Sequence, residues 1–316
     1  MMNTLQRISK KPWIWALLGA SVMWLALGYF AGGLSLESLI TIATSASFLA
    51  IVAMGQMLVI TTGGGAIDLS IPSVITLSAF LSTGFVNGSN INLLYGIPIV
   101  LAIGAGIGMI NAMMVLYLKI PPIIATLGMS YIVTTGIMLY NKNFRAFTIA
   151  PLLEKIARNR IFGAIPIILI IVLLLVFLLS LLLERTRYGK SLIAVGQNVK
   201  AASLAGIRVY LIQALAYVMS GLLAAFGGIM ISARVGGAFL GLGDPYLLLT
   251  VASVVVGGTA ITGGKAVPVG TFFGSLFLTL LTTAMQVAGL TIGIQYVITG
   301  VLIILVLYLA TEERNQ

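Results

Sequence analysis

The stretch IFGAIPIILIIVLLLVFLLSLLL, residues Ile161–Leu183, contains no charged residue and decides the fold class of this protein. A helix needs roughly 20 apolar residues to cross the hydrocarbon core of a bilayer, and this stretch is long enough. Other uncharged runs fill most of the chain, at Pro12–Leu36, Ser38–Ile67, Leu69–Leu118, Ile120–Asn141, Val209–Ala233, Pro245–Gly264 and Ala266–Thr311. Two of these runs are long enough for two spans each, so the sequence predicts ten spans.

The composition points the same way. Of 316 residues, 60% are hydrophobic and only 8% are charged, with a mean hydropathy of +1.15. Soluble chains carry roughly a quarter charged residues, so a water-soluble fold is excluded. We predict an all-α polytopic membrane protein with a single transmembrane domain over residues 1–316. The expected spans are near 13–32, 39–61, 67–87, 94–118, 122–140, 163–183, 210–232, 246–263, 267–288 and 292–310, the first being retained rather than cleaved as a signal.

The residue inventory argues against an enzyme. The chain has no cysteine and no histidine, which removes disulfides, imidazole catalysis and the usual zinc sites. The stretch GGTAITGGKA looks like a phosphate-binding loop, but Thr259 replaces its first glycine and Ala266 replaces the Ser or Thr that binds magnesium. We therefore expect no catalytic set, no metal site and no cofactor in this chain.

The net charge of +10 has a topological explanation. In a soluble protein it would suggest nucleic-acid binding, but here the cations lie in loops, where Lys and Arg favour the cytoplasmic side. With a cytoplasmic amino terminus, eleven of the seventeen cations lie inside: Arg7, Lys10, Lys11, Lys119, Arg185, Arg187, Lys190, Lys200, Arg208, Lys265 and Arg314. The bias predicts that both termini are cytoplasmic, and we expect no nucleic-acid partner.

Two loops stand out between the expected spans. The external loop, about residues 141–162, departs from the charge rule because it carries Lys142, Arg145, Lys155, Arg158 and Arg160. Such a cluster suits an acidic docking partner; the alternative is a solvated amphipathic segment. The loop of about residues 184–209 is expected in the cytoplasm, and its stretch NVKAASLAGI predicts a short helix that ends at Gly206.

Polar residues inside hydrophobic runs are candidates for a translocation path or gate, because they are costly to leave facing lipid. The polar residues of this kind are Gln56, Asp68, Asn111, Gln213, Gln286 and Gln295, and the three assigned to a path or gate are Gln56, Asp68 and Asn111. Asp68 is the only acid within a hydrophobic block and follows three glycines in TTGGGAIDLSIPS, residues Thr61–Ser73. One interpretation is that it lines a polar path or gate; the other is that it caps the amino end of the third span.

Glycine spacing adds two expectations. Gly104 with Gly108, and Gly270 with Gly274, have the four-residue spacing that lets helices approach closely in lipid. The triplet Thr-Gly-Gly recurs at 62–64 and 262–264, each time at the end of an apolar run and before a proline. This echo suggests an internal repeat of spans 2–5 and 7–10; the alternative is chance similarity in a glycine-rich chain.

Four blocks in order carry a family resemblance: TTGGGAIDLSIPS at Thr61–Ser73, NAMMVLYLKIPPIIATLG at Asn111–Gly128, TRYGKSLIAVGQNVKAASLAGI at Thr186–Ile207, and VASVVVGGTAITGG at Val251–Gly264. With these blocks the chain resembles the inner-membrane permease subunits of binding-protein-dependent ABC importers, in the ribose-type branch that serves sugars. It departs from that pattern in having IDLSIPS for the usual IDLSVGS and AVGQN for the usual AIGGN.

The resemblance implies a bacterial inner-membrane transport subunit rather than an enzyme. Such a subunit pairs with a second permease, identical or homologous, and works with two ATPase subunits that bind ATP and Mg and with an extracytoplasmic substrate-binding protein. The expected solute is a ribose-like monosaccharide or related small polar molecule. The alternatives are a branched-chain amino-acid or nucleoside permease of the same type, or an ion-coupled secondary transporter.

The resemblance also assigns a coupling segment. The segment through which members of this family contact the ATPase is similar in sequence to Thr186–Ile207, which lies in the loop that the charge distribution places in the cytoplasm. On this basis the residues expected to contact the ATPase are Tyr188, Gly189, Asn198, Ala201, Ala202, Gly206 and Ile207.

Overall fold

The computed structural model describes residues 13–30, 32–142 and 148–312, so Arg145 and the terminal cations lie outside the described residues. Its helices are α2 (Trp13–Phe30), α3 (Leu36–Thr61), α4 (Ile71–Val86), α5 (Leu93–Ala112) with the π-helical turn η1 (Met113–Tyr117), α6 (Pro122–Asn141), α7 (Pro151–Arg158), α8 (Ile167–Arg185), α9 (Arg187–Gln197), α10 (Val199–Leu204), α11 (Val209–Val235), α12 (Tyr246–Val256), α13 (Pro268–Val287) and α14 (Ile292–Glu312). The strands β1 (Arg160–Ile161) and β2 (Ile165–Pro166) form a short antiparallel hairpin.

The all-α multi-pass fold is confirmed. Within the described part of the chain, seven helices are long and apolar enough to cross a membrane: α2, α3, α5 with η1, α6, α8, α11 and α13. Three shorter apolar helices, α4, α12 and the described apolar part of α14, occupy the other expected spans. A helix therefore stands in each of the ten hydrophobic segments that the sequence marks.

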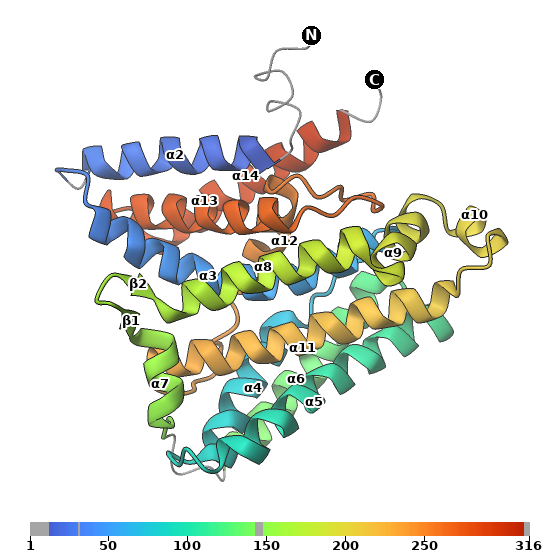
Figure 1. The fold of residues 1–316 in the computed structure, drawn as a ribbon, viewed down its shortest axis with the longest axis horizontal. Helices are drawn as coiled ribbons and strands as arrows, with labels where there is room; N and C mark the ends of the chain where they lie inside the picture. The colour runs from blue at the N-terminus through green and yellow to red at the C-terminus, as the bar shows by residue number, and fades with distance from the viewer. Residues whose placement is uncertain (1–12, 31, 143–147, 313–316) are drawn as a thin grey trace.

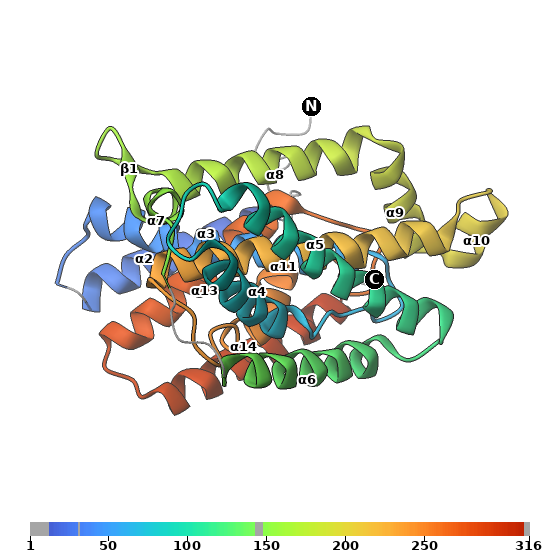
Figure 2. The same cartoon turned by 90° about the horizontal axis from the view of Figure 1, so that it is seen from below.

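The centre of the bundle is formed by α3 and α11. From Ala46 to Thr61 every residue of α3 is buried, which suits a helix that contacts protein on all sides. α11 packs against α3, α4 and α5, and α13 packs against α2, α3 and α12. In Figures 1 and 2, α8 and α11 run along the long axis, with α9 and α10 at one end and α7 and the β1–β2 hairpin at the other.

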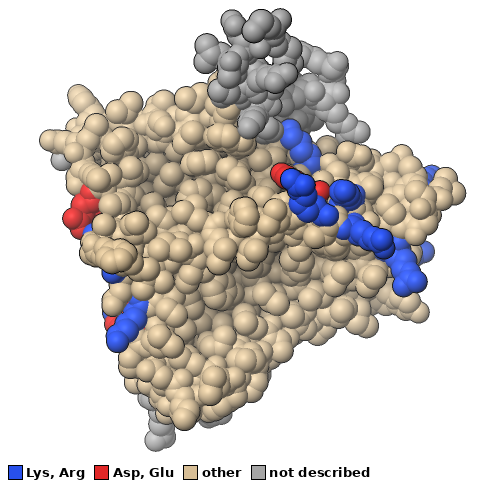
Figure 3. All heavy atoms as spheres, viewed as in Figure 1, with Lys and Arg blue, Asp and Glu red and all other residues tan. Residues whose placement is uncertain are grey.

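The surface follows the same axis. On the face drawn in Figure 3, Lys and Arg side chains gather at the two ends, and the surface between them is almost free of charge. Large apolar side chains are exposed on several of the long helices, among them Leu25 on α2, Ile132 on α6, and Leu174 and Phe177 on α8. A wide uncharged belt between two charged ends is what a bilayer-spanning protein requires.

Three helix boundaries differ from the sequence prediction by four residues or more, each for a local reason. α8 starts at Ile167 rather than 163, because the hairpin turns through Phe162 and Gly163, both at positive φ. α12 ends at Val256 rather than 263, where Gly257 and Gly258 follow and Gly258 has φ +84°. α4 starts at 71 rather than 67, after an irregular loop that contains Asp68.

Close packing at the paired glycines is confirmed. A methyl group on Gly104 would lie 2.5 Å from the carbonyl oxygen of Gly221, and one on Gly108 would overlap the Tyr217 carbonyl, so α5 and α11 touch backbone to backbone. Gly270 and Gly274 bring α13 equally close to α12. Small residues at these positions allow the close approach.

The first prediction concerns this contact. Gly108→Ala forces α5 away from α11 and should cost about 1–3 kcal/mol of stability, as overpacking does. The melting temperature of the purified protein in detergent should fall.

Gly106→Ala is the matched control, because Gly106 lies on the same helix with nothing within 4 Å of the added methyl group. It should leave the melting temperature unchanged or raise it slightly, since alanine favours a helix by up to ~1 kcal/mol. Equal melting temperatures for the two variants would contradict the packing argument.

Candidate functional site

A buried polar cluster surrounds Asp68 in the loop between α3 and α4. Its Oδ1 accepts hydrogen bonds from the Ser70 hydroxyl at 2.6 Å and the Ser70 N–H at 3.0 Å. Its Oδ2 accepts the Ser220 hydroxyl of α11 at 2.8 Å. Asp68 is only 3% exposed, and a buried carboxylate needs such partners to be tolerated. The loop is thereby tied to the central helix α11.

The other two candidates of the path or gate prediction belong to the same cluster. The Asn111 amide donates to the Ser70 hydroxyl at 2.8 Å, and the Gln56 Oε1 accepts the Asp68 N–H at 3.3 Å. Both side chains are fully buried, and each keeps one amide atom without a hydrogen-bond partner in the described part of the chain. The structure thus brings together three residues that lie on different elements, α3, the loop and α5.

Both interpretations of Asp68 can now be stated in atomic terms. The N-cap position of α4 is Ser70, and the carboxylate accepts the N–H of that residue rather than an N–H of the first turn. The carboxylate also bridges to α11, which a simple cap does not do. Its role in a path or gate stays a prediction, since Asp68 is closed off from the surface of this subunit.

Thr126 completes the support of this loop. Its hydroxyl accepts a hydrogen bond from the Leu69 N–H at 3.0 Å and donates one to the Ile67 carbonyl at 3.2 Å. Sequence reasoning missed Ser70, Thr126 and Ser220 as partners of the loop. The signal for Thr126 was its place in the Asn111–Gly128 block; Ser220 lies in a run that carries no motif.

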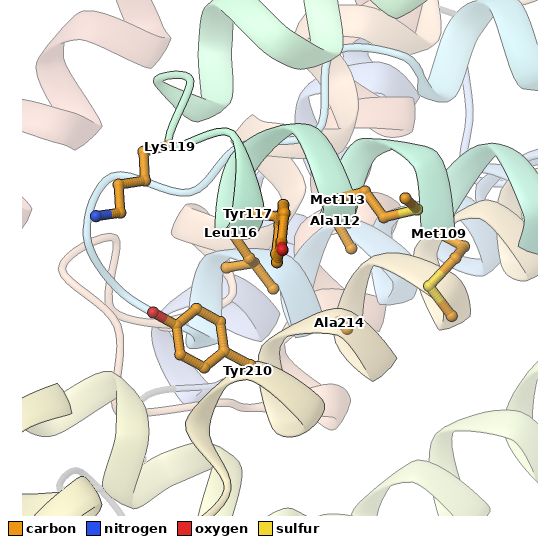
Figure 4. Close-up of a pocket in the computed structure, with 8 residues that line it drawn as sticks. All are labelled: Met109, Ala112, Met113, Leu116, Tyr117, Lys119, Tyr210 and Ala214. Carbon is orange, nitrogen blue, oxygen red and sulfur yellow. The ribbon is translucent and has the colours of Figure 1, made fainter.

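A groove of about 600 Å³ opens between η1 and the start of α11. Figure 4 shows Lys119 and the Tyr210 hydroxyl at one end of it and Met109 at the other. Its lining residues Leu116 and Ala214 pack against a small buried cluster that includes Tyr217. The groove is mostly apolar, and no member of the Asp68 cluster lines it.

The predicted coupling segment forms two helices at one end of the molecule. Thr186 caps α9 by accepting the Gly189 N–H at 3.2 Å, and Asn198 caps α10 by accepting the Ala201 N–H at 3.0 Å. Gly206, at φ +81°, follows α10 and turns the chain toward α11. The short helix ending at this glycine is confirmed, whereas α9 was not predicted. Figures 1 and 2 show α10 projecting beyond the rest of the bundle.

The seven residues assigned to the ATPase contact differ in accessibility. Asn198, Ala201 and Gly206 are exposed, Tyr188 and Ile207 are half-buried, and Gly189 and Ala202 are buried. Burial raises the pKa of the Tyr188 hydroxyl, which has no partner in the described part of the chain.

The buried residues Gly189 and Ala202 help to position the two helices. The residues of the set that a partner can reach lie on α10 and at its two ends. Its most exposed apolar residue, Leu204 at 91%, was missed. The sequence signal for Leu204 was an apolar side chain in a charged loop, two residues before Gly206.

The basic external loop lies at the opposite end of the bundle. Arg160 pairs with Glu37 at the start of α3 at 2.9 Å, and Arg158 donates to the Arg234 carbonyl at 3.0 Å and pairs with Glu154. These two arginines therefore hold α7 and the hairpin against α3 and α11.

The remaining described cations of this loop, Lys142 and Lys155, have exposed side chains with no hydrogen bond or ion pair to the described residues. Those two are the accessible part of the predicted docking cluster. As for metals, no group of three acids, cysteines or histidines gathers in the described part of the chain.

A multi-pass bundle with polar residues buried at its centre is an architecture that membrane transport subunits use. The comparison with known families identifies it further. Residues 38–307 match the family described as branched-chain amino acid transport system / permease component. The chain belongs to this family of permeases, so it is a transport subunit and not an enzyme.

Individual relatives agree with this assignment. The chain is 32% identical to the ribose import permease protein RbsC of Escherichia coli (strain K12), over 89% of this chain and 87% of the relative. It is 31% identical to the autoinducer 2 import system permease protein LsrD of Photorhabdus laumondii, over 96% and 92%. It is 32% identical to the fructose import permease protein FrcC of Rhizobium meliloti, over 89% and 80%. No solved structure matches it. The resemblance to ribose-type import permeases is confirmed.

The second prediction tests the Asp68 cluster. Ser220→Ala leaves the Oδ2 of a buried carboxylate without its hydroxyl donor, which should cost about 1–3 kcal/mol and lower the melting temperature in detergent.

Ser232→Ala is the control, because Ser232 lies on the same helix, is equally buried, and donates only to the Ile229 carbonyl of its own helix. It should shift the melting temperature much less. Equal shifts would show that the bond to Asp68 has no special weight.

Proposed function

We propose that this chain is the membrane-spanning permease of an ABC importer that carries a sugar into the cell across the bacterial inner membrane. The observation that carries the proposal is the match along almost the whole chain to import permeases named for ribose and fructose. The solute is then a ribose-like monosaccharide or a related small polar molecule. A membrane location with several spans follows from the helices themselves.

The two ends of the bundle support a division of labour. α10 projects at the end that the charge bias assigns to the cytoplasm, so it offers a contact for an ATPase. A groove of about 530 Å³ between α10 and α11, lined by Leu204, Val209 and Tyr210 among others, is a place where such a partner can seat a side chain. Two ATPase subunits, which bind ATP and Mg, would drive the cycle.

The path itself requires a second permease subunit. Gln56, Asp68 and Asn111 are buried within one subunit, and the groove that opens near them is mostly apolar, whereas a sugar needs polar partners. A path between two permeases, identical or homologous, meets this need. Within it the Asp68 loop would act as a gate element, because an irregular segment can move without unwinding a helix.

A second candidate solute is a branched-chain amino acid, because the family's description names such a system. The relatives reported above are named for sugars and autoinducer 2 instead. The sugar is therefore the better-supported candidate.

The third prediction tests the transport function. The permease is reconstituted in proteoliposomes with its ATPase, and its binding protein is added to the outside. Uptake of radiolabelled ribose, fructose, galactose and leucine is measured with and without internal ATP. We expect ATP-dependent uptake of one or more of the sugars and none of leucine.

Each other result has a distinct meaning. Leucine uptake alone would favour the amino-acid candidate. Uptake driven by a sodium or proton gradient without ATP would favour a secondary transporter. No ATP-dependent uptake of any solute that the binding protein binds would refute the importer.

The fourth prediction separates the two ends. Leu204→Glu should weaken copurification of the ATPase, because a charge replaces the exposed apolar side chain of α10. It should leave binding of the substrate-binding protein unchanged. Lys155→Glu should do the reverse, weakening the binding protein's stimulation of ATP hydrolysis, because it inverts an accessible charge of the external loop.

Lys155→Arg keeps the charge and is the matched control. It should behave as the wild type does. If Lys155→Glu leaves stimulation unchanged, the cations of this loop have only a topological role. If Leu204→Glu keeps full ATPase binding, the contact does not lie on α10.

A further inference from the structure

Three segments that are far apart in sequence meet at a single point near the coupling helices. They are the turn after α3 at 62–64, the turn at 262–264 between α12 and α13, and the end of α9 at Gly196. The Gly264 N–H donates to the Thr61 carbonyl at 3.0 Å. The recurrent Thr-Gly-Gly triplets are therefore neighbours in space, which gives their similarity a local packing reason; the repeat of spans 2–5 and 7–10 stays a prediction.

Glycine is required at this point for two separate reasons. Gly63, Gly64, Gly263 and Gly264 have φ of +78°, +65°, +91° and +75°, which residues with a side chain rarely adopt. Space is the second reason. A methyl group on Gly263 would lie 2.5 Å from the Gly63 nitrogen, and one on Gly63 would lie 2.9 Å from the Gly196 carbonyl oxygen.

Gly196 is the most informative member, because it lies in a helix and needs no special φ. Its only requirement is space: a methyl group there would overlap the Thr61 carbonyl oxygen and the Gly264 N–H. At Gly196 the end of α9 thus touches both turns through backbone atoms, and beside it the Gln197 amide donates to the Gly264 carbonyl at 3.5 Å. Such a contact transmits displacement with little slack, since close-packed interiors are stiff.

The elements on either side of this contact are the projecting helix α10, the Asp68 loop and α13. α9 continues through the Asn198 cap directly into α10, the projecting helix. The turn at 62–64 begins the loop that carries Asp68, which is bonded to Ser220 at the centre of the bundle. The turn at 262–264 leads through Pro268 into α13.

We propose that Gly196, seated against the turns at 62–64 and 262–264, is the positioning residue that passes movement of α9 and α10 to the Asp68 loop during transport. This inference rests on the proposed importer function. It differs from a plain contact with the ATPase, because Gly196 faces inward and acts only through its neighbours. The contact is continuous in the backbone from the projecting helix to the central polar cluster.

Gly196→Ala is a sharp test. Alanine favours the α9 helix by up to ~1 kcal/mol, so the helix itself is not weakened, while the contact is forced apart. In the complete transporter with ATPase and binding protein, the complex should assemble and hydrolyse ATP at close to the wild-type rate. Sugar uptake per ATP hydrolysed should fall about tenfold, a usual size for coupling between sites.

Gly106→Ala in the same complex is the control and should keep the wild-type ratio of uptake to hydrolysis. If Gly196→Ala also keeps that ratio, or if uptake and hydrolysis fall together in proportion to lost complex, the contact is only structural and the inference is overturned. Wild-type uptake is measured alongside, so failure of the importer function itself would be seen separately as its absence there.

A second measurement does not depend on whether the Gly196→Ala variant folds. Spin labels are attached at Lys190→Cys on α9 and Lys265→Cys in the turn after Gly264, both exposed positions. In an otherwise wild-type complex the distance between the two labels of one subunit should keep the same narrow distribution with and without ATP, because the two segments move as one body. A distance that changes on ATP binding would show that α9 slides past the turn and would overturn the inference.

Discussion

The structure depends on the hydrogen bonds of a non-helical segment inside the bundle, the loop between α3 and α4. In lipid every backbone polar group needs an internal partner, so irregular backbone is tolerated only where protein surrounds it. In the loop between α3 and α4, Gln56 accepts the Asp68 N–H, Thr126 accepts the Leu69 N–H, and the Asp68 carboxylate accepts the Ser70 N–H. Ser220 in turn donates to that carboxylate. Because these partners come from α3, α6 and α11, the loop also joins the helices that surround it.

The non-helical segment between α12 and α13 also has internal hydrogen-bond partners for its backbone. Thr259 accepts the Val267 N–H at 3.1 Å, and the Ala260 N–H bonds to the Lys265 carbonyl at 3.2 Å. The two non-helical segments contact each other at their glycine turns, beside α9. Two non-helical segments of the bundle therefore lie beside α9, next to the contact proposed for an ATPase.

Some features were readable from particular residues. The uncharged stretch from 161 to 183 predicted α8, although the hairpin delayed its start to Ile167. Gly206 marked the end of α10, and Gly104 and Gly108 marked the contact with α11. The three polar candidates Gln56, Asp68 and Asn111 were found because buried polarity is rare in lipid, but their mutual bonds were not, since hydropathy carries no information on which helices are neighbours. Likewise α7 and α9 are short amphipathic helices, which a search for hydrophobic runs passes over.

The sequence by itself determined that this chain spans a membrane, which hydrophobic segments are helical, and the family to which it belongs, because these depend on local composition and on motifs contiguous in the chain. Tertiary structure alone decided that Ser220 partners Asp68, that Arg158 and Arg160 hold the external loop while Lys155 stays accessible, and that Gly196 lies against two turns some 70 to 130 residues away in sequence. The physical reason is the range of the interactions. Crossing a bilayer is a property of about 20 consecutive residues, whereas hydrogen bonds and backbone contacts join whichever segments the packing of helices brings together.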